Sequence, residues 1–402
     1  MESSTFSRRS ALGMGVVAAL GIAGVSGGRP AAAAPADSGT VRPTGTGYVR
    51  YEDLYKPGDT VSAAMARLTQ PAIITFPEGR FECSDFGTGY NAGISIPKIA
   101  KGIWGSGRGT VGGSTGTIFT IRENTSSKRS LVPAQSSGGT TPTTVMMHSG
   151  STSGATFGQF QVAGTEQGHI FHGFAVYNPG GVVAVTDVLV TGWAGNNGAP
   201  PGETFGLTLH GGSNNTLTRV EADGRRAEGG PSFGAVGLTY QDTVGGSMVD
   251  CVAHHCVANP VVLFQSFNVI TENIKVGRAD DNVRGVTAGS GINHERTSGC
   301  EHRNPTILTR ETRRGVHMTH SNDKFTLTRG GVAHSSANGT LKVVNPTYND
   351  IWGNNKFYIE TWSPYWTGNT MTTANPPLVV KSDDKTKVPY KWAFSGKQYN
   401  IA

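Results

Sequence analysis

The chain has 402 residues, of which 57 are glycine, roughly twice the usual glycine share of globular proteins. Glycine costs about 1 kcal/mol per helix position, which excludes a helical bundle or coiled coil, and the lack of a three-residue glycine period excludes collagen. The formal net charge is +6 and apolar residues recur throughout, which disfavours long disorder and leaves a large, glycine-punctuated, mostly β protein.

Residues 1–36 have the features of a bacterial export signal. A twin-arginine pattern at 7–12 precedes a weakly apolar stretch, and an alanine-rich run at 31–36 suits cleavage. The apolar stretch has about 15 residues, whereas a membrane anchor needs about 20, so an anchor is disfavoured. We therefore expect a protein secreted by the twin-arginine pathway of a bacterium, with no membrane contact after cleavage.

The mature chain is expected to have a linker over 37–47 and one domain over 48–402. Its surface is mildly basic, which is compatible with an acidic polymer as partner. No run of Lys and Arg interleaved with aromatic residues suggests nucleic acid.

The start of this domain has a distinctive order of elements. Residues 59–68 predict a short amphipathic helix with Asp59 or Thr60 as N-cap. A strand pattern ending in Phe-Pro-Glu-Gly follows, and further strands close on the Gly-Ile-Trp-Gly-Ser-Gly of 102–107. This order resembles the start of pectate-lyase-like β-helix proteins, and the general resemblance extends over residues 48 to about 350. It implies a fold and a polysaccharide as partner, but no specific reaction.

A repeat of short strands sets the architecture. Strand starts align at intervals of 31, 23, 31 and 24 residues, at Gly206, Gly237, Pro260, Gly291 and Gly315. Second strands are expected at 215–220, 247–252, 268–274 and 323–328. Each unit is too short to bury its own apolar face, so successive units must stack and share one interior. The fold class is therefore all-β, a right-handed parallel β-helix with a short N-terminal capping helix.

Alternation along the aligned strands sorts their side chains into inward and outward columns. The inward columns are Leu207, Leu238, Val261, Ile292, Val316 and Leu209, Tyr240, Leu263, His294, Met318. The outward columns are Thr208, Thr239, Val262, Asn293, His317 and His210, Gln241, Phe264, Glu295, Thr319, with Asp242, Arg296 and His320 just beyond. Coils stack about 4.8 Å apart, so the outward polar residues form a strip long enough for several sugar units.

The outward strip predicts a glycoside hydrolase. Hydrolysis needs a general acid and a base or nucleophile, normally two carboxyl groups, and Glu295 and Asp242 are the best pair. Their two-coil separation of about 9 to 10 Å favours the inverting arrangement. We assign Glu295 as acid, Asp242 as base and no cofactor or metal. Substrate contacts are expected from His210, Gln241, Arg296, His317 and His320.

Two alternatives remain. A polysaccharide lyase would remove the proton next to a uronic acid carboxylate and neutralise the developing charge with a cation. Arg296, Lys324 or a histidine could serve, with calcium held by Asp242 or by Asp280 and Asp281. The third possibility is a glycan-binding surface protein without catalysis, for which paired titratable groups are not needed.

Four cysteines fit an exported protein. Cys251 and Cys256 lie close together, while Cys83 and Cys300 are solitary. We expect disulfides or buried thiols. The less favoured interpretation is a metal site that uses the intervening His254 and His255, since zinc sites usually show two spaced ligand pairs.

Two further segments stand out by composition. Residues 125–154 are rich in Ser, Thr and Gly and predict a surface excursion. Residues 341–402 are rich in aromatic side chains, which we interpret as a terminal cap or, less favoured, as platforms for stacking sugars.

Overall fold

The computed structural model describes residues 42–83, 92–121, 143–149, 154–164, 170–177, 180–193, 204–225, 227–228, 230, 234–277, 290–295, 297, 299–309 and, from 314 onward, the strands alone. The predicted export signal at 1–36 lies outside these residues. Neither helix in the described part of the chain is long and apolar enough to cross a membrane.

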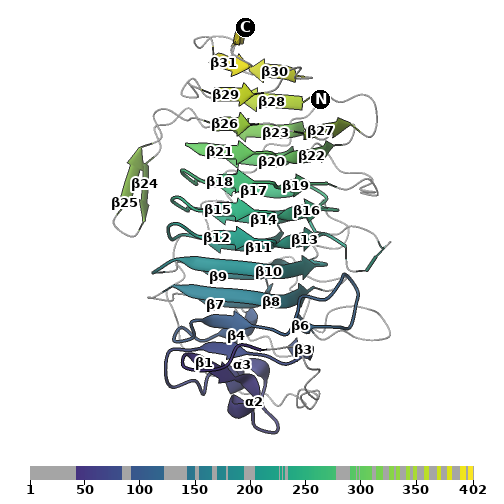
Figure 1. The fold of residues 1–402 in the computed structure, drawn as a ribbon, viewed down its shortest axis with the longest axis vertical. Helices are drawn as coiled ribbons and strands as arrows, with labels where there is room; N and C mark the ends of the chain where they lie inside the picture. Colours follow the sequence, from purple (N-terminus) through teal and green to yellow (C-terminus); the bar gives the residue numbers. More distant parts are fainter. Residues whose placement is uncertain are drawn as a thin grey trace, which may run out of the picture.

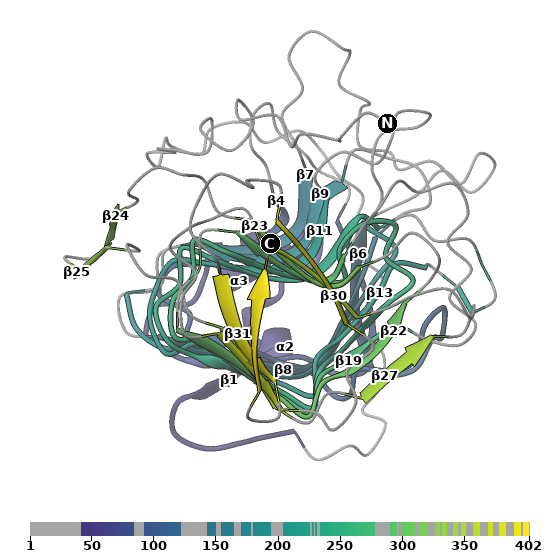
Figure 2. The ribbon, with the colours of Figure 1, turned by 90° about the horizontal axis from the view of Figure 1, so that it is seen from above.

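Stacked coils of parallel strands build the molecule, rising from the N-terminal end to the C-terminal end (Figure 1). Viewed along the stack, the strands enclose one elongated interior (Figure 2). This architecture confirms the predicted right-handed parallel β-helix.

Each regular coil contributes three strands, one to a ten-stranded sheet and two to a twenty-stranded sheet. The ten-stranded sheet contains β4 (Ala92–Ile96), β7 (Thr143–Ser149), β9 (Ile170–Tyr177), β11 (Phe205–His210), β14 (Val236–Gln241), β17 (Val261–Phe264), β20 (Ser290–Glu295), β23 (Arg314–Thr319), β28 (Phe357–Thr361) and β30 (Leu378–Ser382). β7 lies within the segment 125–154, which the sequence predicted to be a surface excursion, so that prediction is wrong for this part.

The twenty-stranded sheet holds the second and third strands of the coils. Its second-strand column contains β1 (Tyr48–Arg50), β2 (Ile73–Thr75), β5 (Gly102–Trp104), β8 (Ala155–Ala163), β10 (Val183–Thr191), β12 (Thr216–Thr218), β15 (Ser247–Val249), β18 (Ile270–Glu272), β21 (Cys300–Arg303), β26 (Leu341–Val344), β29 (Asn369–Thr372) and β31 (Tyr390–Phe394). Its third-strand column contains β3 (Gly79–Cys83), β6 (Thr117–Ile121), the ends of β8 and β10, β13 (Glu221–Asp223), β16 (Val252–His254), β19 (Lys275–Val276), β22 (Thr306–Thr309) and β27 (Thr347–Asp350).

A bend in left-handed backbone conformation separates the second strand from the third. The sequence predicted one strand over 247–252, but Asp250 has φ 54° and divides it into β15 and β16. Asp and Asn tolerate this conformation better than most residues, and Asn273 occupies the same place one coil later with φ 53°. The side chains at the bend also bond from coil to coil: Asn273 Nδ2 donates to Asp250 Oδ1 at 3.0 Å. The third strand of each coil was therefore not predicted from the sequence.

Another prediction near the C-terminal end needs correction. The segment 323–328 was expected to be a second strand, but β24 (Thr326–Arg329) pairs antiparallel with β25 (Val332–Ser335) in a separate two-stranded sheet beside the stack (Figure 1). The aromatic-rich end, which we interpreted as a terminal cap, contributes strands β26 to β31 to both sheets. The last strand, β32 (Lys397–Ile401), pairs antiparallel with β31 and ends the stack.

Helices α2 (Tyr51–Leu54) and α3 (Val61–Met65) lie at the N-terminal end of the stack (Figure 1). Thr60 is the N-cap of α3, and its hydroxyl accepts the Ala63 amide at 3.1 Å, as one of the two predicted caps requires. Tyr51 stacks on Phe76 at a centroid distance of 4.5 Å. The helices thus continue the buried interior and confirm the predicted capping helix.

The strand register between coils is the one that the aligned repeats predicted. Leu207 pairs with Leu238, Leu238 with Val261, Val261 with Ile292 and Ile292 with Val316. The leading glycines permit close coil contact, since a Cβ on Gly237 would lie 2.4 Å from the Pro260 carbonyl oxygen.

The interior changes from aromatic to aliphatic and then to polar along the stack. Phenylalanine rings near the N-terminal end pack edge to face, for example Phe119 on Phe160 at 5.4 Å. Cys251, Cys256 and Cys300 are buried thiols, so for these three residues the buried-thiol alternative is the correct one. Burial raises the pKa of Cys251 and Cys300 to about 12, which keeps both thiols neutral.

Two histidines form a hydrogen-bonded chain inside the helix. His294 Nε2 and His302 Nε2 are 2.7 Å apart, and the remaining ring nitrogens contact Thr297 Oγ1 at 3.0 Å and Thr271 Oγ1 at 2.6 Å. Burial lowers the pKa of His302 to about 4, so it is neutral in the folded protein near neutral pH.

We predict that acid destabilises this fold through His302. In the unfolded chain its pKa is near 6.5, so stability is fully present above that pH and is lost as pH falls toward 4. The free energy of unfolding should fall by about 2 to 3 kcal/mol from this group alone between about pH 7 and about pH 4.5. Urea unfolding of the wild type and of His302→Gln at both pH values measures the difference. Equal pH dependence in the two proteins would contradict the prediction.

Candidate functional site

On the outward face of the ten-stranded sheet, His210, Gln241, Glu295 and His317 occupy the register positions that the sequence predicted. His210 pairs with Gln241, Gln241 with Phe264, Phe264 with Glu295 and Glu295 with Thr319. A one-residue error in the alignment would have turned this column inward, so the register is the decisive result. The column starts one coil earlier, at Tyr177, which pairs with His210.

His210 and Asp242 form a buried pair on this face. His210 Nε2 lies 2.8 Å from Asp242 Oδ2, and both side chains are about 95% buried, with relative exposures of 5%. Asp242 directly follows β14 and has φ 51°, a left-handed conformation that turns its side chain back toward the preceding coil. From the sequence, Asp242 was assigned as the base and His210 as a substrate contact, whereas the structure joins the two side chains in one hydrogen-bonded pair.

Aromatic rings hold this pair on the side of the preceding coil. The Tyr177 ring meets the His210 imidazole edge to face at 5.4 Å, and its hydroxyl lies 3.3 Å from His172 Nδ1. His172 in turn stacks on Phe205 at 5.2 Å. Burial lowers the pKa of His172 to about 3, and the nearby His210 adds to this, so His172 carries no charge near neutral pH.

Polar atoms without partners surround the pair. Within the described residues, the hydroxyls of Thr208 and Thr239 and the Nδ1 atom of His210 are buried and make no hydrogen bond. Thr208 and Thr239 are paired neighbours on β11 and β14, and each is 1% exposed. Buried polar atoms are nearly always satisfied in folded proteins, so three on one face mark a place where a polar ligand could bind.

An apolar cluster lies at the start of the same strands. It contains Ala235, Val236, Val257 and Val262, and Phe205, Ala258 and Phe264 pack against it. Val257 and Ala258 belong to the turn after β16, which is tied to the segment before β14, one coil earlier, by the bond from Val257 N to Gly234 O at 2.7 Å. This turn therefore forms one wall beside the outward face.

The structure describes the other predicted site residues only in part. Glu295 and His317 occupy their predicted outward register positions on β20 and β23, but their side chains are not described. By strand spacing, the backbone of Glu295 is about 9 to 10 Å from that of Gln241, the residue before Asp242. Arg296 and His320 lie outside the described residues, as do Lys324, Asp280 and Asp281 of the elimination alternative.

A second polar cluster, of which only His254 and His255 were singled out from the sequence, lies on the third-strand column. Asp223 on β13 pairs with His254 on β16, and both point outward because the intervening Ala222 and Ala253 face the interior. Asp223, His254 and His255 are buried, and one ligand atom of each lies within 4.8 Å of the others. We call these three residues the Asp–His–His cluster.

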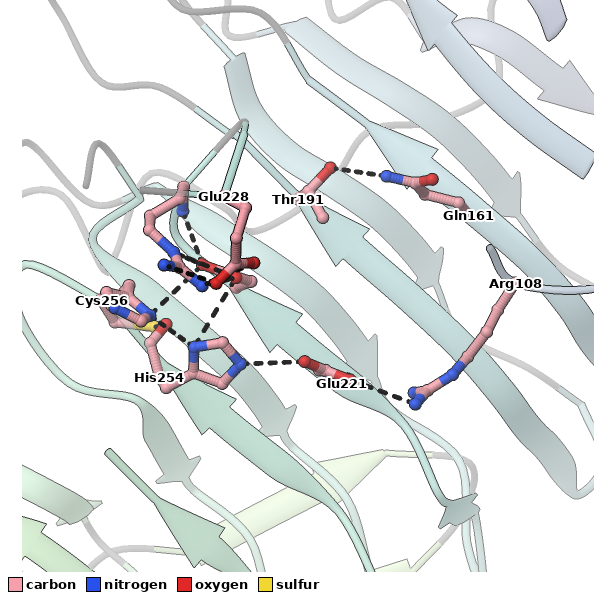
Figure 3. Close-up of polar contacts among 10 residues, drawn as sticks. Arg108, Gln161, Thr191, Glu221, Glu228, His254 and Cys256 are labelled. Carbon is pink, nitrogen blue, oxygen red and sulfur yellow. Dashed lines mark hydrogen bonds and ion pairs between the residues drawn. The ribbon is translucent and has the colours of Figure 1, made fainter. Parts of the chain in front are cut away.

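Charged side chains support the Asp–His–His cluster. His254 Nε2 is 2.9 Å from Glu221 Oε1, and Glu221 also contacts Arg108 at 3.2 Å, as Figure 3 shows. Arg225, which is 2% exposed, donates from Nε to Asp223 Oδ1 at 3.0 Å and from Nη2 to Oδ2 at 2.8 Å. The buried charges are thus paired.

The cysteines beside these histidines are not part of the cluster. Cys251 and Cys256 belong to the buried hydrophobic core, while His254 points outward and His255 has φ 52° at the turn. The predicted metal site over the Cys251–Cys256 segment would therefore have to use histidines alone. The sequence signal that could have revealed this cluster is the pattern Glu-Ala-Asp over 221–223 and Val-Ala-His over 252–254. In both segments the central Ala faces inward, as in a short strand.

Comparisons with known proteins concern the fold. No family model and no curated protein matches the sequence. Similar solved structures include the gp42 tailspike of Acinetobacter phage vb_AbaP_AS12, with 10% identity and a TM-score of 0.45, covering 90% of this chain and 65% of the tailspike. The A-module of the mannuronan C-5 epimerase AlgE4 from Azotobacter vinelandii has 9% identity and a TM-score of 0.37, covering 83% of this chain and 95% of that module. The A-module of AlgE6 from the same organism has 11% identity and a TM-score of 0.33, with coverages of 87% and 83%.

This chain thus spans slightly less than two thirds of the tailspike chain that it matches. At such low identity the likeness concerns chain architecture, and the parallel β-helix fold rests on the strand pairing itself.

We predict that the hydroxyls of Thr208 and Thr239 serve a ligand and not the fold. The double variant Thr208→Val, Thr239→Val keeps the side-chain shape and removes two unpaired polar atoms, so stability should be unchanged or rise by about 1 kcal/mol. Thr117→Val is the matched control, because Thr117 Oγ1 donates to Pro77 O at 2.8 Å and accepts from Ser106 N at 2.8 Å. The control should lose about 1 to 2 kcal/mol in chemical unfolding. A comparable loss in the double variant would show that these hydroxyls stabilise the fold.

Proposed function

We propose that this protein is an exported enzyme that cleaves a polysaccharide bound along the outward face of the ten-stranded sheet. The observation that carries the proposal is the buried His210–Asp242 pair beside the unpartnered hydroxyls of Thr208 and Thr239. An unmade hydrogen bond on a buried polar atom costs about 1 to 3 kcal/mol, which a ligand rich in hydroxyl groups can offset. Export by the twin-arginine pathway, from the pattern at residues 7–12, is part of the proposal.

Hydrolysis of a glycosidic bond is the leading reaction. Glu295 would protonate the leaving oxygen, and Asp242 would activate a water on the opposite side of the sugar ring. His210 donates a hydrogen bond to Asp242 in this scheme, which keeps the carboxylate oriented. Gln241, Arg296, His317 and His320 would contact sugar hydroxyls. The scheme needs two carboxyl groups and no cofactor.

The unpartnered Nδ1 atom of His210 favours β-elimination as a second candidate. With the Nε2 proton directed to Asp242, Nδ1 carries the lone pair and can act as a general base. It would remove the proton next to the carboxylate of a uronic acid unit. Arg296 or Lys324 would then neutralise the developing negative charge, with calcium as a possible further cation held by Asp280 and Asp281.

The products distinguish the two reactions. A panel of neutral and uronic polysaccharides is incubated with the mature protein, and reducing ends and the ultraviolet absorbance of unsaturated ends are both measured. Hydrolysis gives reducing ends alone, whereas elimination gives both signals. Binding to a polysaccharide without either product would leave a glycan-binding protein and overturn the enzymatic proposal.

We predict that the carboxyl pair and His210 carry the turnover. Glu295→Gln and Asp242→Asn should each lower kcat by about 10² to 10⁴, with KM changed much less, because a proton-transfer group is lost and the shape is kept. Under elimination, His210→Gln should be the most damaging single change. Glu272→Gln is the control, since this half-exposed carboxylate lies on β18 of the other sheet. Full activity of both Glu295→Gln and His210→Gln would contradict the proposed site.

A further inference from the structure

The Asp–His–His cluster presents its ligand atoms to one another. His254 Nδ1 and His255 Nδ1 are 2.6 Å apart, Asp223 Oδ2 is 3.7 Å from the former, and Asp223 Oδ1 is 3.6 Å from the latter. Two imidazole nitrogens can approach this closely only if one proton lies between them. The pair is therefore held by a shared proton, which a metal ion can replace.

The surroundings fix the histidine tautomer that a metal needs. The bond between His254 Nε2 and Glu221 Oε1 requires the proton on Nε2, which leaves the Nδ1 lone pair directed toward His255. A carboxylate on the far ring nitrogen is the usual support of a metal-binding histidine. Arg108 contacts the same carboxylate at 3.2 Å and holds it in place (Figure 3).

Local charge also favours a cation. Glu221, Asp223 and Glu228 supply three carboxylates against the two guanidinium groups of Arg225 and Arg108. Asp223 Oδ1 accepts from the Arg225 amide and Nε, and Oδ2 accepts from Nη2 and Nε, so a metal ion has to displace one of these contacts to bind the carboxylate.

We infer that Asp223, His254 and His255 bind one divalent transition-metal ion, of which Zn²⁺ is the expected example. Two nitrogens and one carboxylate oxygen form a ligand set that suits zinc and similar metals, whereas calcium and magnesium prefer oxygen ligands. Bonds of about 2.0 to 2.1 Å in a tetrahedral site separate ligand atoms by about 3.3 Å. The carboxylate distances of 3.7 Å from Oδ2 to His254 and 3.6 Å from Oδ1 to His255 involve different oxygens and are slightly longer than that value. The imidazoles need to move apart by about 0.7 Å.

The position of this site suggests what the ion does. Asp223 and His254 lie on adjacent coils, and His255 opens the turn in which Val257 and Ala258 pack against the outward face of the ten-stranded sheet. The ion would join two coils at the base of this wall. It is distinct from the acid and base assigned above, so it binds whether or not the polysaccharide proposal holds.

The test is metal binding by the mature wild-type protein after removal of metals with a chelator. Calorimetric titration with ZnCl₂ should show one site, and Zn²⁺ should raise the thermal midpoint, because the ion binds the folded state only. Equal concentrations of CaCl₂ and MgCl₂ should have no such effect. Absence of Zn²⁺ binding by the metal-free wild type would overturn the inference and leave a hydrogen-bonded histidine pair.

Variants place the ion. His254→Asn and Asp223→Asn should each weaken Zn²⁺ binding at least tenfold, whereas His210→Asn should leave it unchanged. The last is a matched control, because His210 also contacts a buried carboxylate at 2.8 Å but, within the described residues, shares no hydrogen bond with a second histidine. Unchanged binding in both cluster variants would overturn the inference. If either variant fails to fold, X-ray absorption of the Zn²⁺-loaded wild type tests the ligand set instead. The inference requires scattering from two imidazole ligands, and a spectrum without it would overturn the inference.

Discussion

Parallel hydrogen bonding in register between successive coils is the constraint on which the fold and both polar clusters depend. Because the side-chain period of a strand is two, one register fixes every residue as inward or outward along the whole stack. Leu207, Leu238, Val261 and Ile292 therefore form an interior column, while His210, Gln241 and Glu295 form an outward one. Residues 31 or 23 positions apart become neighbours at strand spacing, which is how dispersed side chains can form a site.

The sequence was sufficient for this part of the structure. The lead glycines mark equivalent places because a Cβ there would meet the next coil, as Gly237 shows against the Pro260 carbonyl. Alternation of Leu and Thr after Gly206 and Gly237 then assigns the faces. The contact between His210 and Asp242 could not be predicted in the same way. It depends on the left-handed conformation of Asp242, which turns its side chain back toward the preceding coil. The alternation of inward and outward residues does not predict this backbone conformation.

The third strand was missed for a related reason. Residues 247–252 have continuous strand character, and only the left-handed Asp250 divides them. Strand propensity cannot detect a one-residue bend of this kind, although repeated Asp and Asn at 250, 273 and 304 are consistent with it. If the bend is not predicted, His254 cannot be assigned to the inward or outward face of a strand, and its pairing with Asp223 cannot be predicted.

The buried histidines of this protein differ in chemistry because their hydrogen-bond partners differ. His302 lies inside the helix with a histidine and a threonine as partners, so it is neutral and serves the fold. His210 and His254 are also buried, but each contacts a carboxylate through Nε2, which directs Nδ1 away from that carboxylate. The Nδ1 atom of His210 meets no partner in the described part of the chain, while that of His254 meets His255. The neighbour at Nδ1 therefore separates the proposed base from the proposed metal ligand.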